Sequence, residues 1–250
     1  MVVDAKTGAI HFRLEGLAPG KHVFVLAARD GAGRQAEEAR ASVWSGAAPT
    51  RESVAIYQVV LDRFEGTNGP LTPPLEPAGR AGGTLVGVRR AIERGELEAM
   101  GISMLWLSPV YRNPEGFFSG GIGRKFSGYH GYWPIDSRAI DPAVGSDGDL
   151  DALVTAAHAR GIRVILDVVP NHVHEGHPLW RDRKGDLAFN APDGKCLCGS
   201  ESCPWATSIE QCWFAPYMPD LNTRREDVLG TVTGVVSCAK SLSQPEYWRE

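Results

Sequence analysis

From residue 54 onward, short apolar runs rich in β-branched residues alternate with longer stretches that have helical spacing. This alternation predicts a parallel sheet covered by helices, the α/β class, because parallel strands need long crossover connections. Ser146 and Asp149 form a capping pattern at the start of one helix, and Gly161 is expected to end it. The expected strands are 54–61, 102–107 and one that begins at 162, and the expected helices are 85–100 and 147–160.

The third strand, IRVILDVVPNH at 162–172, begins as a buried strand and finishes in polar side chains. Asp167 follows the apolar run, and Asn171 and His172 come shortly after it. An ionised carboxylate is costly in an apolar strand unless it is paired or ligated. In barrels of parallel strands the carboxyl end faces the active site, which makes Asp167 a candidate site residue. The alternatives are a loop cap for Asp167 and a structural hydrogen bond for His172.

The stretch GYHGYW at 128–133 places two tyrosines, a histidine and a tryptophan in the connection after the second strand. Aromatic faces stack on the C–H surfaces of pyranose rings, and polar tips bond sugar hydroxyls. Core packing is an alternative for Trp133. It fits the four large residues together poorly, because a glycine-rich loop seldom buries so many side chains.

The composition changes along the chain and divides it into four segments. Residues 1–48 have short alternating runs and turn signals, which predict part of an immunoglobulin-like β-sandwich. Residues 49–172 carry the α/β pattern. Residues 173–222 lose periodicity and gain Gly, Pro, Trp and Cys, which predicts an inserted domain after the third strand. Residues 223–250 are expected to form a helix and a truncated tail.

The bulk composition narrows the classes of partner. The 250 residues are 43% hydrophobic and 22% charged, with a formal net charge of -4, so there is no basic surface for nucleic acid. No apolar stretch approaches the ~18 residues of a spanning helix, and the first residues lack the pattern of a signal peptide. We therefore expect a small neutral partner, without nucleic acid or membrane insertion; the sequence does not indicate an oligomeric state.

Four of the five cysteines lie in one short stretch, CLCGSESCPWATSIEQC, and Cys238 stands apart. Such a cluster predicts disulfides in an oxidising compartment or a structural zinc site. The C-x-C start fits zinc less well than C-x-x-C pairs, so two disulfides are favoured over zinc and over unpaired thiols. This favours an extracellular or periplasmic location. The candidates are Cys196, Cys198, Cys203 and Cys212.

Five motifs, in order along the chain, resemble those of the α-amylase family, glycoside hydrolase family 13. They are YQVVLDRF at 57–64, GISMLWLSP at 101–109, GYHGYW at 128–133, DVVPNH at 167–172 and MPDLN at 218–222. The resemblance covers about residues 54–224. It implies an incomplete TIM (β/α)8 barrel, consisting of the first three βα units and an inserted domain B, preceded by the partial β-sandwich.

The resemblance implies a sugar subsite next to the scissile bond. Tyr132 would stack on the sugar ring, His130 and His172 would bond its hydroxyls, Asp167 would order the site, and Trp133 would wall it from below. The expected ligand is an α-glucan or a maltooligosaccharide.

The resemblance also implies a structural calcium ion between the barrel and domain B. Asn171 and Asp220 match its ligand positions, and hard oxygen ligands suit calcium. A helix-capping acid is the alternative for Asp220.

The acids of the family's reaction are missing from this sequence. Retaining glycoside hydrolysis needs two carboxylic groups about 5–5.5 Å apart. The family carries its nucleophile in a G-x-R-x-D pattern on strand four and its acid/base on strand five, and neither motif occurs here. We therefore assign no catalytic residue and expect this chain to be inactive alone, as an N-terminal piece of an enzyme or the product of a truncated or frameshifted gene.

The leading hypothesis is a glycoside hydrolase of the α-amylase type that acts on α-glucosidic bonds of starch-like glucans. A transglycosylase or an α-glucosidase of the same family is an alternative. A non-catalytic carbohydrate-binding protein, which keeps the aromatic residues without the acids, is the alternative from another class.

Overall fold

The computed structural model describes most of the chain up to residue 225. It covers residues 2–3, 10–11, 13–35, 39–46, 54–71, 73–74, 76–119, 123–185, 187–198, 200, 203, 205–208 and 210–225. The chain divides into two compact units, Met1–Ser53 and Val54–Glu250, where the sequence predicted a boundary after residue 48. The helix and tail expected at 223–250 lie almost entirely outside the described residues, as does Cys238.

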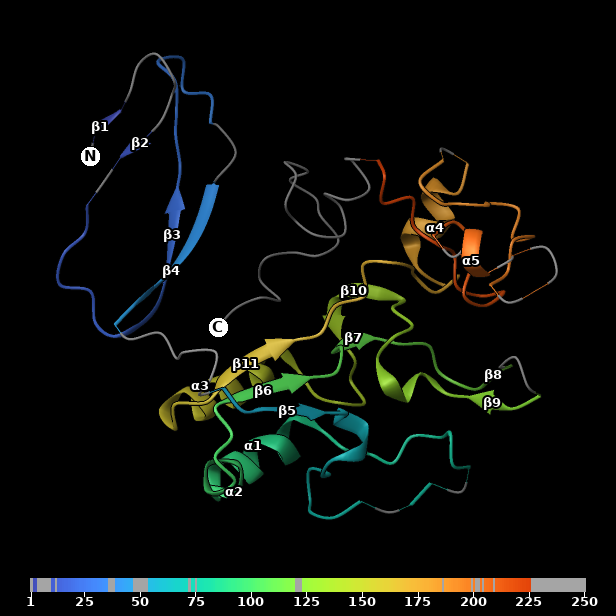
Figure 1. Cartoon of the computed structure of the whole chain (residues 1–250), viewed down its shortest axis with the longest axis horizontal. Helices are drawn as coiled ribbons and strands as arrows, with labels where there is room; N and C mark the ends of the chain where they lie inside the picture. The colour runs from blue at the N-terminus through green and yellow to red at the C-terminus, as the bar shows by residue number, and fades with distance from the viewer. Residues whose placement is uncertain are drawn as a thin grey trace. The chain divides into compact units, whose positions relative to one another are not determined.

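The first unit contains two small antiparallel sheets (Figure 1). Strand β1 (Val2–Val3) pairs with β2 (Ile10–His11), and β3 (Gly20–Leu26) pairs with β4 (Ala39–Ser45). The turn signal after β3 works through Asp30, whose carboxylate accepts hydrogen bonds from the backbone of Ala32 and Arg34, both at 2.9 Å. The β-sandwich expected for this segment stays a prediction.

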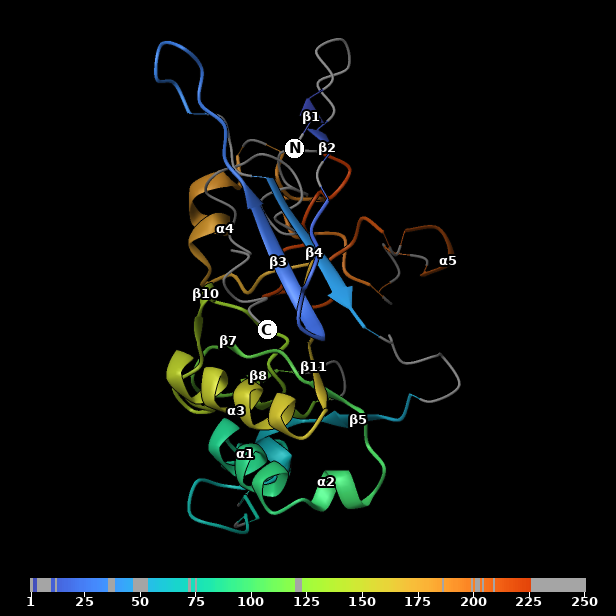
Figure 2. The same cartoon turned by 90° about the vertical axis from the view of Figure 1, so that its left-hand side faces the viewer.

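The second unit is built on a parallel three-stranded sheet in the order β11-β6-β5. Its strands are β5 (Ile56–Val59), β6 (Met104–Leu107) and β11 (Arg163–Leu166). Figures 1 and 2 show three helices, α1 (Leu85–Glu93), α2 (Glu96–Ala99) and α3 (Asp147–Ala159), on one face of this sheet. The α/β pattern predicted from residue 54 onward is confirmed, with strands shorter than expected. The first one ends early because Leu61–Arg63 turns into the 3-10 helix η2.

The two faces of this sheet differ in burial. Leu105, Leu107 and Val164 face the helices and belong to one buried cluster with residues of α1 and α3. Ile56 and Ile165 are on the other face and are 52% and 36% exposed. Alternate residues of a strand point to opposite faces, so the helices cover only one side of the sheet.

The helix predicted at 85–100 is two helices, α1 (Leu85–Glu93) and α2 (Glu96–Ala99). Gly95 lies between them with φ 78°, a left-handed conformation that ends the first helix. Thr84 caps α1 by accepting a hydrogen bond from the Gly87 backbone at 3.1 Å. A glycine within the predicted helix therefore marked its boundary.

Helix α3 (Asp147–Ala159) begins as predicted, with a capping box between Ser146 and Asp149. Gly161, at φ 69°, follows its end and leads the chain directly into β11. Local sequence rules thus set both ends of the helix that precedes the strand carrying Asp167.

The remaining elements are short and lie beyond the carboxyl ends of β6 and β11 (Figure 1). Residues 173–222 have a small core of their own around Val173, Phe189 and Leu221. In the part of the chain that the structure describes, no helix has the length and apolarity to cross a membrane. The short elements beyond β6 and β11 are β7 (Tyr111–Arg112), β8 (Phe118–Ser119), β9 (Lys125–Phe126), η3 (Gly128–His130), β10 (Asp136–Ile140), α4 (Pro178–Arg183) and α5 (Trp205–Ser208).

Candidate functional site

Asp167 lies at the carboxyl end of β11, where the sequence places it. Its backbone N–H continues the ladder by donating to the Leu107 carbonyl at 3.0 Å. Its carboxylate accepts a hydrogen bond of 2.6 Å from the Tyr132 hydroxyl and one of 2.8 Å from the Val168 backbone. Burial, reinforced by the bond to Asp167, raises the pKa of Tyr132 to about 12, so its hydroxyl keeps its proton and donates. The two predicted residues thus form one unit.

Two imidazoles hold the backbone of Tyr132. His172 contacts the Tyr132 carbonyl through Nε2 at 2.9 Å, and His130 accepts the Tyr132 N–H at Nδ1 at 3.0 Å. Burial lowers the pKa of His172, and burial together with Arg80, His172 and Arg63 lowers the pKa of His130 to about 4. Both rings are therefore neutral at neutral pH. His130 keeps its Nε2–H as a donor, and His172 Nδ1 is an acceptor that faces the Asn171 amide at 3.5 Å.

Aromatic rings form the base of the site. His130 stacks on Tyr132 with 5.8 Å between ring centroids and meets the edge of Trp133 at 4.6 Å. Trp133 is 7% exposed and packs edge-on against Phe118 and Tyr217 at 5.5 and 5.2 Å. Trp133 is consequently a packed support under the site, with its ring largely withdrawn from solvent.

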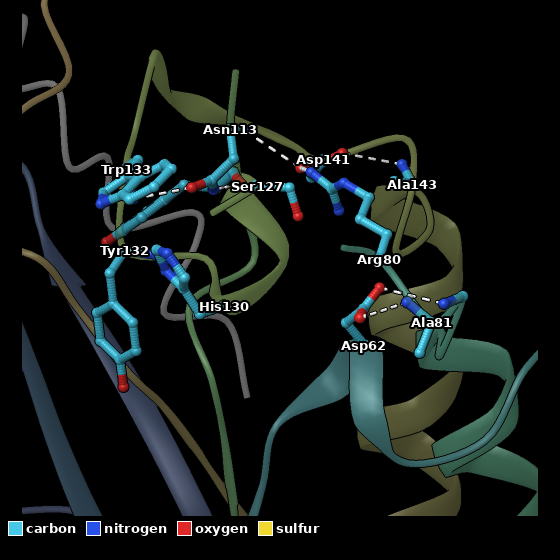
Figure 3. A network of polar contacts seen from close by, with 12 residues as sticks. Asp62, Arg80, Ala81, Asn113, Ser127, His130, Tyr132, Trp133, Asp141 and Ala143 are labelled. Atoms are coloured by element: carbon cyan, nitrogen blue, oxygen red, sulfur yellow. Dashed lines mark hydrogen bonds and ion pairs between the residues drawn. The ribbon is translucent and has the colours of Figure 1, made fainter. Parts of the chain in front are cut away.

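A buried polar network fixes the loop that carries these rings (Figure 3). The Asn113 side chain accepts the Trp133 N–H at 2.8 Å and donates to the Tyr111 carbonyl at 2.7 Å. Asp141 in turn accepts the Asn113 N–H at 3.2 Å and the Arg80 guanidinium at 2.6 Å. Asn113 and Asp141 are 4% and 5% exposed. The position of Trp133 therefore depends on residues from three separate loops.

A second network begins at the end of the first strand. Asp62, 1% exposed, accepts the backbone N–H groups of Ala81 and Gly82 at 2.7 and 3.2 Å and pairs with Arg63. The Arg63 guanidinium lies 3.8 Å from the centroid of the Tyr129 ring. Arg63 thus connects the end of β5 to the loop that carries the aromatic residues. Figure 3 shows Asp62 with its hydrogen bond to Ala81.

A pocket of about 890 Å³ opens over these rings. Four of the five predicted sugar-binding residues line it, and Asp167 contacts one of them, Tyr132. The inserted segment also lines the pocket, with Cys198, Phe214 and Tyr217 among its residues. None of the described residues that line the pocket is an aspartate or a glutamate. The pocket can therefore stack on a ring and exchange hydrogen bonds with it, but it lacks a lining acid. The four predicted residues are His130, Tyr132, Trp133 and His172.

Several residues of the site were not singled out from the sequence. Phe214 and Tyr217 lie in an aperiodic segment, where no local pattern distinguishes a pocket wall from a core contact. Asn113 carried one usable signal, because it is a polar residue followed by proline in the connection after the second strand. Asp141 and Arg80 are 61 residues apart in sequence and carried no local signal.

The structure brings Asn171 and Asp220 together, 49 residues apart in sequence. The Asn171 amide donates to one carboxylate oxygen of Asp220 at 2.9 Å, and the Asn190 amide donates to the other at 2.8 Å. Asp220 is 2% exposed, and burial raises its pKa to about 6, against the two amide hydrogen bonds. Glu210 contributes a backbone carbonyl 3.4 Å from the Asn190 amide.

These groups fit a hard divalent cation. Asp220 is a buried carboxylate whose side-chain partners, among the described residues, are neutral amides. Rotation of either amide by half a turn would present its oxygen in place of its nitrogen. Carboxylate, amide and backbone oxygens are the ligands that calcium prefers.

The structure contains one disulfide among the four cysteines that the sequence predicts to be bridged, and a second bridge stays a prediction. Cys196 and Cys212 are joined, with 4.8 Å between their Cα atoms, whereas Cys198 and Cys203 are free thiols. The Cys198 thiol donates to the Cys212 carbonyl at 3.2 Å. That hydrogen bond gives Cys198 a polar partner without a second bridge.

The fold and the pocket together define the structural class of this protein. The chain is an α/β protein whose parallel strands deliver polar groups at their carboxyl ends to an aromatic pocket, the usual place for a site in such sheets.

The comparisons with known proteins give the family. The family model described as "Alpha amylase, catalytic domain" matches residues 58–195. The chain therefore belongs to the α-amylase family.

Individual relatives agree with this assignment. Alpha-amylase mde5 of Schizosaccharomyces pombe is 30% identical over 187 residues, covering 71% of this chain and 34% of that protein. The cyclomaltodextrin glucanotransferase of Bacillus sp. (strain 1-1) is 35% identical over 129 residues, covering 47% of this chain and 17% of that protein. The α-amylase of Geobacillus thermoleovorans, solved with acarbose, superposes with a TM-score of 0.57 at 31% identity, covering 74% of this chain and 37% of that one. The chain thus spans about a third of the length of the α-amylases that it matches.

Proposed function

We propose that the pocket binds a glucose unit of a starch-like α-glucan as one side of an α-amylase-type active site. The observation that carries this proposal is Tyr132, held between Asp167 and two neutral imidazoles in an aromatic pocket. An aromatic face stacks on the C–H surface of a pyranose, while the neighbouring Nε2–H of His130 and Nδ1 of His172 can bond its hydroxyls.

We place the three parallel strands as the first three of a (β/α)8 barrel, with 173–222 as an inserted domain B. Two observations support this placement. One face of the sheet exposes Ile56 and Ile165, and Trp106 on the same face has a buried indole N–H without a partner among the described residues. Further strands would cover that face.

The proposed part in the reaction is to bind and orient the substrate. Retaining hydrolysis needs a pair of carboxylic groups about 5–5.5 Å apart, and no described pocket-lining residue is a carboxylate. We therefore expect this chain alone to bind maltooligosaccharides and to hydrolyse none. Whether the complete site hydrolyses its substrate or transfers glycosyl groups depends on residues outside this pocket, and both activities occur among the names of the relatives.

Calcium is the proposed structural cofactor, held by Asn171 and Asp220. The ion would supply positive charge to a buried carboxylate and join the third strand to the inserted segment. The Cys196–Cys212 disulfide supports an exported protein, because such bonds persist in oxidising compartments.

Calorimetry with maltoheptaose tests the sugar site. The chain should bind this sugar, and Tyr132→Ala should weaken binding by at least about tenfold, because a stacking face and the bond to Asp167 are both lost. Phe117→Ala is the matched control, since Phe117 is 47% exposed and lies outside this pocket. Equal binding by the two variants would contradict the assignment of Tyr132, and release of reducing sugar by the chain alone would contradict a purely binding role.

A further inference from the structure

Two thiols lie beside the Cys196–Cys212 disulfide, and the proposed sugar and calcium sites use neither of them. Cys203 is 1% exposed. Cys198 is half-buried and lines the pocket on the side of the inserted segment.

Hydrogen bonds of the backbone bring the two thiols to the same place. The Cys198 N–H donates to the Trp213 carbonyl at 2.8 Å, which holds Cys198 beside the disulfide. From there the chain turns back twice, because Ser200 N–H donates to Leu197 at 3.1 Å and Cys203 N–H donates to Ser200 at 3.0 Å. The described residues Leu197, Cys198, Ser200 and Cys203 are therefore held close together by backbone hydrogen bonds.

Three of the four sulfur atoms form one cluster. The Cys203 Sγ and the two sulfurs of the disulfide all lie within 4.8 Å of one another. The Cys198 Sγ lies beside this cluster, because it donates to the Cys212 carbonyl at 3.2 Å and has Cys203 as a neighbour.

We propose that Cys198 and Cys203 close a second disulfide, which holds Leu197, Cys198 and Ser200 in the wall of the pocket. This pairing uses both remaining thiols of the cluster and leaves the Cys196–Cys212 bond unchanged. The bridge itself does not depend on what the pocket binds; only its effect on sugar affinity rests on the proposed function.

The oxidant in this step is a disulfide of a small thiol or of an oxidising protein. The Cys198 thiolate attacks one sulfur of the oxidant, forms a mixed disulfide and releases the first thiolate. The Cys203 thiolate then attacks Cys198 Sγ and releases the second thiolate. Two electrons pass from the cysteine pair to the oxidant, and the two cysteine protons end on the released thiolates.

The accessibility of the two thiols suits these roles. Cys198 can meet an oxidant from the pocket, and Cys203, which is buried, resolves the mixed disulfide. Burial, and to a smaller extent the neighbouring Cys203, raises the pKa of the Cys198 thiol to about 11. Bridge formation should therefore be slow at neutral pH and accelerate by up to about tenfold per pH unit toward that value.

Peptide mapping of the oxidised chain under non-reducing conditions tests the pairing. The expected products are a Cys196–Cys212 link and a Cys198–Cys203 link. Cys198→Ser and Cys203→Ser should each keep only the first link, whereas Cys238→Ser, the matched control, should keep both. Two results would overturn the proposal: alkylation of both Cys198 and Cys203 in oxidised protein, or one zinc ion bound by the four cysteines in native mass spectrometry.

The effect on the pocket is measured separately. Loss of the bridge in Cys198→Ser or Cys203→Ser should lower the melting temperature by about 5 °C and weaken maltoheptaose binding severalfold. A wild-type chain that contains both links but binds no maltoheptaose would contradict the proposed function and leave the bridge standing. Unchanged melting and unchanged affinity in the variants would refute the role of the bridge in holding the wall.

Discussion

At the scale of single residues, the site depends on how buried polar groups are paired and on how burial changes their pKa values. Asp167 avoids the cost of an unpaired carboxylate by accepting the Tyr132 hydroxyl. Asp220 has only neutral donors beside it among the described residues, and its pKa is raised from 3.8 to about 6. Its folded state therefore holds a proton more tightly than its unfolded state does.

This shift predicts the sign of a pH dependence. In calcium-free protein, Asp220 should lower the free energy of unfolding by about 2–3 kcal/mol as the pH rises from about 4 to 7. Half-buried His130 and buried His174 and His177 act in the opposite direction. Their pKa values are lowered to about 4, so their stabilising contribution is lost as the pH falls from about 6.5 through 4. The substitution Asp220→Asn removes the contribution of this carboxylate to the pH dependence of stability and leaves that of the histidines.

Urea unfolding with a chelator present can isolate that contribution. The free energy of unfolding of Asp220→Asn, minus that of the wild type, should increase over this pH range. Parallel curves for the two proteins would show that Asp220 does not titrate as inferred.

At the scale of elements, glycines decide where the functional loop can run. Gly131 has φ 85°, and a Cβ atom there would collide with the carbonyl oxygen of Pro109. The loop GYHGYW can therefore pass close behind the second strand only with glycine at this position.

Gly131→Ala should destabilise the protein and displace Tyr132, since it adds a steric collision to an unfavourable φ. Gly161→Ala is the matched control, because Gly161 has φ 69° but nothing within 4 Å of its Cβ position. The control should cost about 1 kcal/mol, and Gly131→Ala should cost clearly more and also reduce maltoheptaose binding. Equal melting temperatures would argue against the close approach to Pro109.

At the scale of the whole molecule, the inserted segment and the third strand meet at the pocket and at the proposed calcium site. Leu221 donates its N–H to the Asn171 carbonyl at 2.8 Å, and Asp220 accepts the Asn171 amide. A cation at this junction would connect two segments that are far apart in sequence.

Calcium should therefore raise the melting temperature. At a concentration of about 100 times its dissociation constant, the ion should stabilise the folded state by about 2.7 kcal/mol. Asn171→Ala should reduce this response, and Asp220→Asn should nearly abolish it. An Asn171→Ala protein that responds to calcium like the wild type would remove Asn171 as a ligand.

The sequence by itself determined the α/β pattern, the capping of α3, the place of Asp167 at the end of a strand, and the aromatic loop. These features follow from spacing between near neighbours, which periodicity and turn chemistry control. Only the tertiary structure decided that Asn113, Asp141 and Arg80 fix Trp133, that Phe214 and Tyr217 complete the pocket, that Asn190 joins Asp220, and that Cys196 pairs with Cys212. Those contacts join residues from separate segments, and packing in three dimensions selects them from many pairings that the local sequence permits.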